Sequence, residues 1–256
     1  MIDLAIADGI ARVTLDAPAK LNALDETGLR ELASAYQEAE AAGVRALVLS
    51  GTGRAFCAGR DIAGVDPATD DVSGYLDGLV TPLLRRMSAF PAPTFAAAQG
   101  ASLGVGLGLL LATDVVYVAE DAKIGSPFAA LGALLDSGGH SLFVSRLGAH
   151  KALDLIYTGR LMSGTEAVAS GLFSRALPAG ELQQAVDAAA ATAASGATAA
   201  LLASKRIVAA IRDGELALWD AVAAENRAQA ELRDTADYRE GFAAFQQKRK
   251  PEFRGE

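Results

Sequence analysis

The first half of the sequence alternates between segments typical of strands and segments typical of helices. Residues 10 to 16, IARVTLD, alternate apolar and polar side chains as a half-buried strand does, and residues 44 to 50, VRALVLS, suit a more fully buried strand. Between them, Asp25 is placed to cap a helix whose apolar residues recur at helical spacing until Gly43. This order predicts two strands joined by a crossover helix.

A second unit of the same kind follows. Residues 94 to 99, TFAAAQ, and 115 to 119, VVYVA, have strand patterns, and a stretch rich in glycine and leucine between them opens a helix. Beyond about residue 140 the pattern is helical almost throughout, with two helices interrupted near Gly196. We therefore expect an α/β fold in which helices cover a largely parallel sheet, followed by a helical C-terminal portion.

Charge and composition narrow the class of protein. Lysine and arginine number 23 against 31 aspartate and glutamate residues, and the net charge of −8 offers no electrostatic footprint for nucleic acid or an anionic membrane. The most apolar stretch, residues 103 to 112, is far shorter than the roughly 20 residues of a membrane-spanning helix. Cys57 is the single cysteine, and the acidic N-terminus is unlike a signal peptide. We expect a cytoplasmic protein that binds neither nucleic acid nor membranes.

Two glycine-containing loops each follow a predicted strand. In GTGRAFCAGRDI, residues 51 to 62, Ala58 and Gly59 would let a ligand approach the backbone closely, although an ordinary strand-exit loop has the same composition. QGASLGVGLG, residues 99 to 108, fits neither the dinucleotide nor the phosphate-loop pattern. It leaves amides exposed at a helix N-terminus, which would suit a developing negative charge, or it serves close helix packing.

Asp136 lies between an apolar run and two glycines in LGALLDSGG, residues 131 to 139. A carboxylate at the edge of a hydrophobic pocket loses hydration and can become a useful base. The alternative is that Asp136 caps the helix that follows it. A metal pair with His140 lacks a third ligand, and Ser137, His140 and Asp136 are too close in sequence for a hydrolase triad. We predict no metal site.

Four segments in order resemble one known family, the crotonase superfamily of enoyl-CoA hydratases and isomerases. "AFCAGRDI" and "QGASLGVGLGLLLATDVVYVAEDAKIG" are similar to its two oxyanion-loop motifs. "YTGRLMSGTEAVASGLFSRAL" matches a later pattern, and "REGFAAFQQKRKPEFRG" resembles the C-terminal helix of the family. The resemblance spans nearly the whole chain.

The resemblance implies stacked ββα units over residues 1 to 195 and a helical C-terminal region over residues 196 to 256 that takes part in oligomerisation and covers the pocket. It further implies an acyl-CoA thioester as substrate and a homotrimer or a hexamer as the assembly. No cofactor is expected, because coenzyme A is part of the substrate.

In such proteins the thioester oxygen lies between two backbone amides, which fall at Arg60 and Val105 in this sequence. Preorganised donors are needed because a thioester enolate is otherwise too unstable to form, and each contributes about 3 to 4 kcal/mol. The substrate-binding residues implied by the same alignment are Ala58, Gly59, Asp61, Ile62, Gly104, Phe128 and Leu131.

The sequence departs from the hydratase pattern at both catalytic acids. Hydratases of this family carry two glutamates, and the matching positions here are Gly108 and Phe128. Asp136 instead matches the position at which several isomerases place their acid, and "DSGG" is similar to 1,2-epoxyphenylacetyl-CoA isomerases. Δ3,Δ2-enoyl-CoA isomerases tend to carry a glutamate there.

One carboxylate is enough for isomerisation, because it can remove a proton from C2 and return it at C4. We expect an apolar lining of Phe128, Leu131 and Leu134 to exclude water and to raise the pKa of Asp136. The sequence thus favours an acyl-CoA isomerase with Asp136 as proton shuttle. Hydratase-type activity, epoxyphenylacetyl-CoA isomerisation and a non-catalytic acyl-CoA binder remain as alternatives.

Overall fold

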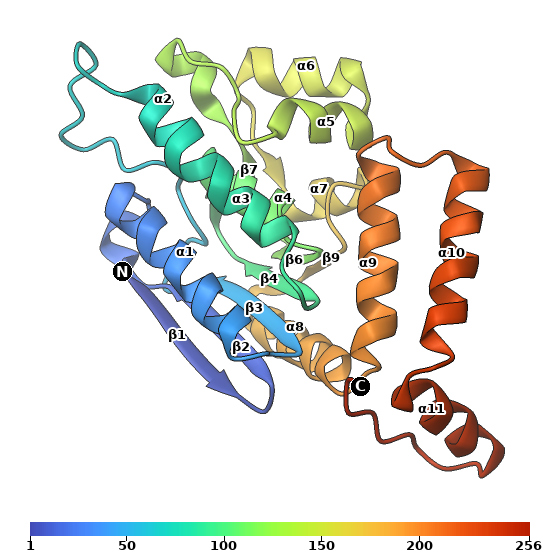
Figure 1. Ribbon diagram of the computed structural model, residues 1–256. Helices are drawn as coiled ribbons and strands as arrows, with labels where there is room; N and C mark the ends of the chain where they lie inside the picture. The colour runs from blue at the N-terminus through green and yellow to red at the C-terminus, as the bar shows by residue number, and fades with distance from the viewer.

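A six-stranded sheet forms the centre of the molecule in the computed structural model, which describes residues 1–256 (Figure 1). Its strand order is β1-β2-β3-β4-β6-β9. The first pair is antiparallel, and every other neighbouring pair is parallel. The strands are β1 (Ile2–Ala7), β2 (Ile10–Leu15), β3 (Ala46–Gly51), β4 (Thr94–Ala98), β6 (Val115–Ala119) and β9 (Arg175–Leu177).

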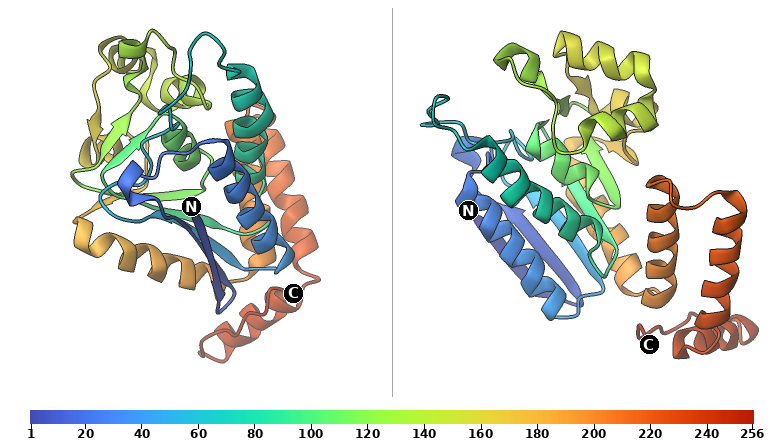
Figure 2. Two further views of the ribbon diagram at one scale, coloured as in Figure 1. Left: turned by 90° about the vertical axis from the view of Figure 1, so that its left-hand side faces the viewer. Right: turned by 45° about the horizontal axis from the view of Figure 1, so that its top comes forward.

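Helices cover both faces of this sheet. On one face α1 packs against β1, β2 and α3, and on the other α8 packs against β3, β4 and β6 (Figure 2). The helices are α1 (Glu26–Ala41), α2 (Val72–Tyr75), α3 (Thr81–Ser88), α4 (Val105–Leu111), α5 (Gly139–Leu147), α6 (Ala149–Thr158), α7 (Gly164–Ala169), α8 (Ala179–Ala194), α9 (Thr198–Arg212), α10 (Leu218–Leu232) and α11 (Ala236–Gln246). A π-helical turn over Leu76–Val80 joins α2 to α3.

The predicted α/β elements are confirmed. Strands β2, β3, β4 and β6 fall within about two residues of their predicted limits. Helix α1 begins after Asp25, whose carboxylate accepts a hydrogen bond of 2.8 Å from the Gly28 amide as an N-cap should. The break near Gly196 separates α8 from α9. The edge strands β1 and β9 are additional to the prediction.

A second, three-stranded sheet lies beside the first and carries the site. It consists of β5 (Ala101–Leu103), β7 (Lys123–Gly125) and β8 (Met162–Ser163) in the order β5-β7-β8. Strand β5 follows β4 almost directly and leads into α4, while β7 follows β6. In the pairs β4–β5 and β6–β7 the first strand therefore lies in the large sheet and the second in the small one, whereas β1 and β2 both lie in the large sheet.

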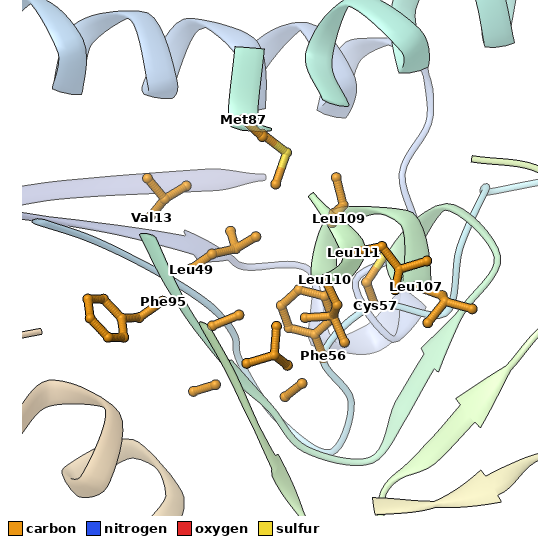
Figure 3. Packing of buried hydrophobic residues seen from close by; sticks show 14 of the residues in the cluster. Val13, Leu49, Phe56, Cys57, Met87, Phe95, Leu107, Leu109, Leu110 and Leu111 are labelled. Carbon is orange, nitrogen blue, oxygen red and sulfur yellow. The ribbon is translucent and has the colours of Figure 1, made fainter. Parts of the chain in front are cut away.

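The core between the large sheet and the helices is continuous with the wall of the site. Figure 3 shows Leu49 of β3 and Met87 of α3 in the same packed cluster as Cys57 and the leucines of α4. Every residue of α4 is buried, which explains why its sequence is apolar on all sides. Burial raises the pKa of the Cys57 thiol to about 12, as expected for a packing residue.

The last three helices project from the sheet as an arm, with α9 and α10 side by side (Figures 1 and 2). Large apolar side chains lie exposed on this arm, among them Trp219 at 77 % and Phe245 at 82 % exposure. These aromatic residues therefore do not pack into the core of their own chain. No single helix is long and apolar enough to cross a membrane, and only α8 and α9 meet that test together, across a bend of 110°.

Candidate active site

The two glycine-containing loops lie side by side at the end of the small sheet. The Cys57 amide donates to the carbonyl of Ala101, and the Leu103 amide donates to the carbonyl of Cys57, each at 3.0 Å. These bonds form an isolated parallel bridge between residues 57 and 102. The segment from Ala58 to Arg60 is thereby held beside the turn that begins α4.

Glycines make this close approach possible. A Cβ on Gly59, where φ is +101°, would lie 2.9 Å from the Leu103 carbonyl oxygen, and a Cβ on Gly106 would collide with the Cys57 carbonyl oxygen. Gly104 turns the chain into α4 at φ +52°, a conformation that other residues rarely adopt. The glycines of the second loop thus serve close packing, at Gly106, and the turn that starts α4, at Gly104.

Both predicted oxyanion donors have free amide hydrogens. The Arg60 amide makes no hydrogen bond within the chain, whereas the next amide, that of Asp61, donates to Leu24 at 3.0 Å. The Val105 amide is the first of α4 and has no acceptor, because the helical ladder starts with Gly108 donating to Gly104. Two unpaired donors on adjoining segments can bind one oxyanion.

The Arg60 side chain is fixed by a set of contacts that the sequence did not reveal. Its guanidinium forms a bidentate ion pair with Asp70, with N–O distances of 2.8 and 2.6 Å. It also lies over the ring of Tyr75, 4.1 Å from the centroid. The buried Tyr75 hydroxyl donates to the Leu24 carbonyl, which the Asp61 amide also contacts. This ring of contacts should hold the Arg60 amide in place.

Asp136 does not cap its helix. The N-cap of α5 is Gly138, which makes no side-chain capping bond, and the Asp136 carboxylate instead accepts a hydrogen bond of 2.8 Å from the Ser137 hydroxyl. Asp136 is half-buried. Its negative charge contributes to the raised pKa of Tyr75, and the positive charge of Arg60 acts to lower the pKa of Asp136. The Asp136 carboxylate therefore lies within electrostatic range of the Arg60 guanidinium.

Burial raises the pKa of Asp136 above its ordinary value, mainly through lost hydration, while the Ser137 hydrogen bond and the Arg60 charge act in the opposite direction. Every other carboxylate with a shifted pKa has it lowered by a partner: Asp61, Asp70, Glu166, Asp213, Asp234 and Glu240. Asp136 is thus the only carboxylate of the chain whose pKa is shifted upward.

The two positions that match the hydratase glutamates hold groups without acid–base function. At Gly108 a Cβ would lie 2.5 Å from the Cβ of Ser137, so the residue after Asp136 occupies the space of a side chain. Phe128 is half-buried and crosses Gly104, where a Cβ would lie 2.6 Å from its Cζ. An aromatic ring therefore covers the turn at the second amide.

The expected apolar lining around Asp136 is wrong in part. Leu131 and Leu134 are 63 % and 71 % exposed, so they do not enclose the carboxylate within this chain. Leu131 ends a 3-10 turn over Pro127–Leu131 that stops at the left-handed Gly132. Asp136 is nevertheless half-buried, and this burial reduces its hydration.

Three other predicted substrate-binding residues lie in the first loop, residues 51 to 62. Ala58 is half-buried, Ile62 is 54 % exposed, and Asp61 forms an ion pair of 2.7 Å with Lys20. Their roles toward a substrate remain predictions. The chain gathers no group of three histidine, cysteine, aspartate or glutamate side chains that could hold a metal ion.

Comparisons with known proteins identify the family of the chain. The enoyl-CoA hydratase/isomerase family profile matches residues 5–256. The chain belongs to the enoyl-CoA hydratase/isomerase family. It is 35 % identical over 250 residues to a probable enoyl-CoA hydratase of Rhodobacter capsulatus, covering 98 % of this chain and 96 % of that one. A probable enoyl-CoA hydratase of Rhizobium meliloti is 38 % identical over 247 residues, covering 96 % of this chain and 94 % of that one.

Solved structures of this family share the fold. The enoyl-CoA hydratase of Bacillus anthracis superposes with a TM-score of 0.90 at 28 % identity, covering 100 % of this chain and 99 % of that one. A structure from Mycobacterium abscessus reaches a TM-score of 0.92 at 30 % identity over all of both chains. The predicted crotonase-like fold is therefore confirmed.

Proposed function

We propose that this protein is an acyl-CoA isomerase that moves a double bond from C3–C4 to C2–C3 of an acyl thioester. The observation that carries the proposal is Asp136, a half-buried carboxylate with a raised pKa whose neighbour Ser137 packs against Gly108 in the helix that begins with the free Val105 amide. Positions 108 and 128 carry no acid. The relatives are named as hydratases, but that reaction uses two acids in this family, and this site supplies one.

The proposed reaction needs a single base. The Asp136 carboxylate removes a proton from C2, and the negative charge moves onto the thioester oxygen between the Arg60 and Val105 amides. The dienolate then takes the same proton from the Asp136 carboxyl group at C4, and the double bond forms between C2 and C3. Asp136 ends as a carboxylate, ready for the next turnover. Each amide donor would stabilise the dienolate by about 3 to 4 kcal/mol.

The decisive experiment offers the purified protein two substrates, 3-hexenoyl-CoA and 2-hexenoyl-CoA in water. We expect conversion of the first to the second and little addition of water to the second. Fast hydration of 2-hexenoyl-CoA would contradict the proposal. An epoxyphenylacetyl-CoA substrate tests the ring-modifying alternative. A non-catalytic binder would bind the thioesters without exchanging the C2 proton in heavy water.

The pH dependence of kcat/KM provides a second test of Asp136 as the proton shuttle. Asp136 must be ionised to accept the C2 proton, so kcat/KM should fall as the pH drops through its raised pKa. Arg60→Met removes the positive charge that lowers this pKa and leaves Asp70 unpaired, so the acid limb should move to higher pH. Asp70→Asn leaves the guanidinium uncompensated and should move the limb to lower pH.

The pH profile of each variant measures these shifts, with Arg54→Met as control because Arg54 is exposed in the same loop and makes no ion pair. Opposite movements from Arg60→Met and Asp70→Asn would identify Asp136 as the titrating base. Identical profiles in all four proteins would assign the acid limb to another group.

The assembly and location also belong to the proposal. The exposed aromatic residues on α10 and α11, such as Trp219 and Phe245, are best explained by contact with further copies of the chain, as in the trimer or hexamer that the family resemblance implies. With a single buried cysteine and no disulfide, the protein suits the cytoplasm.

A further inference from the structure

A cavity of about 1110 Å³ adjoins the candidate site at the residue that follows Asp136 and at Gly108 of α4. Gly108 and Ser137, next to Asp136, form one part of its wall. The rest lies between α3, α5 and α9, so the cavity is placed to receive whatever follows the reacting carbons of a bound acyl group. This volume is ample for a chain of several carbons.

The lining of this cavity is unusually polar for a site that holds an alkyl chain. Only 9 of its 23 lining residues are hydrophobic. Hydroxyl groups line it from α3 and α5, at Thr81, Ser88, Ser141 and Ser145. Ser145 donates to the Leu142 carbonyl and Ser88 accepts from Arg212, but Thr81 and Ser141 make no side-chain hydrogen bond within the chain. Covering Thr81 and Ser141 with methylenes would remove their water without supplying a partner, which carries a cost for each.

Four cations also line the cavity, and two of them have no partner. Lys205 pairs with Asp114 at 2.9 Å, and Arg212 pairs with Asp213 at 2.7 Å. Arg85 on α3 and Arg206 on α9 make no ion pair and no side-chain hydrogen bond within the chain. The only acid in the lining without an ion-pair partner is Glu215. The cavity therefore has an excess of positive charge in a chain whose net charge is −8.

We propose that the distal end of the acyl chain carries a carboxylate, and that Arg85 and Arg206 bind it in this cavity. The substrate class is then an ω-carboxyacyl thioester, the half-thioester of a dicarboxylic acid. This inference rests on the proposed function, since it assumes a thioester at the two amides. Guanidinium groups suit the role because they bind carboxylates in a bidentate manner and stay ionised.

The test measures binding with thioesters that have no double bond and cannot react. Calorimetric titration compares hexanoyl-CoA with adipoyl-CoA, its six-carbon ω-carboxy counterpart, and octanoyl-CoA with suberoyl-CoA at eight carbons. We expect the wild-type protein to bind the ω-carboxy member at least about tenfold more tightly in one of the pairs. In the double variant Arg85→Met/Arg206→Met this preference should disappear, while the affinity for the uncharged member stays within about twofold.

Arg86→Met is the matched control, because Arg86 neighbours Arg85 on α3 but pairs with Glu40 and does not line the cavity. It should keep the preference. Equal binding of both members by the wild type would overturn the inference, and so would an equal loss for both in the double variant, which would place the arginines on the coenzyme A phosphates. A changed oligomeric state in the double variant, measured by mass photometry, would assign them to a subunit contact instead.

The failure of this inference is distinguishable from failure of the proposed function. Turnover of 3-hexenoyl-CoA tests the isomerase proposal and does not depend on a distal carboxylate. A protein that isomerises 3-hexenoyl-CoA but shows no ω-carboxy preference keeps the function and loses the substrate class.

Discussion

Replacing Asp136 with asparagine should lower the rate of double-bond isomerisation by at least about a hundredfold, because the variant has no other base at the site. The asparagine side chain has the same size and can still accept the hydrogen bond from Ser137, so the turn before α5 should survive. The loss should appear in kcat, since the amides of Arg60 and Val105 still bind the thioester. Single-turnover kinetics with 3-hexenoyl-CoA measure it.

The same variant should be at least as stable as the wild type at pH 7. Because the folded state raises the pKa of Asp136, the folded protein binds more protons there than the unfolded chain, and the free energy of unfolding falls as the pH rises through that range. Above the raised pKa the ionised carboxylate costs stability, and asparagine removes this cost. Thermal unfolding at pH 5 and pH 7 measures the difference.

A loss of activity together with a loss of folding would assign Asp136 a structural role. Unchanged isomerisation in a well-folded variant would exclude it as the proton shuttle. The combination of lower activity and unchanged or greater stability is typical of a residue kept for chemistry at a cost to the fold.

The sequence predicts the centre of the fold well because the pattern there is local. Strands such as β3 and β6 are continuous apolar runs, and α1 has a capping residue and an amphipathic face. The three-residue strand β9 carries no such pattern, since its place at the sheet edge depends on pairing with β6, far away in sequence. The strand β1 is exposed along much of its length and gives a weak signal.

The candidate site likewise contains residues that local motifs predict and contacts that depend on the tertiary structure. Arg60, Val105 and Asp136 lie in short motifs that a family resemblance can identify. Asp70 and Tyr75 contact Arg60 from ten and fifteen positions further along the chain, across an irregular loop. Such a loop has no periodicity from which side-chain contacts can be predicted. Ser137 was visible in the sequence, but its left-handed φ of +54° and its position against Gly108 depend on the packing of α4 against the loop.

Introducing the missing acid as Gly108→Glu should impair isomerisation and should not create hydratase activity. A Cβ at position 108 would lie 2.5 Å from the Cβ of Ser137, so the turn that carries Asp136 must move before the new carboxylate finds any room. Overpacking of this kind costs about 1 to 3 kcal/mol of stability. We expect activity on 3-hexenoyl-CoA to fall at least about tenfold, with no water addition to 2-hexenoyl-CoA.

Gly108→Ala separates the steric effect from the charge, because alanine adds the Cβ alone. Its activity should fall in the same direction, and its melting temperature should drop. Gly78→Ala is the matched control: a Cβ there meets nothing within 4 Å, so the variant should keep full activity and gain up to about 1 kcal/mol. If Gly108→Glu instead hydrated 2-hexenoyl-CoA, the site would have kept space for a hydratase acid, and the choice between the two reactions would depend on one side chain rather than on the fold of the Asp136 turn.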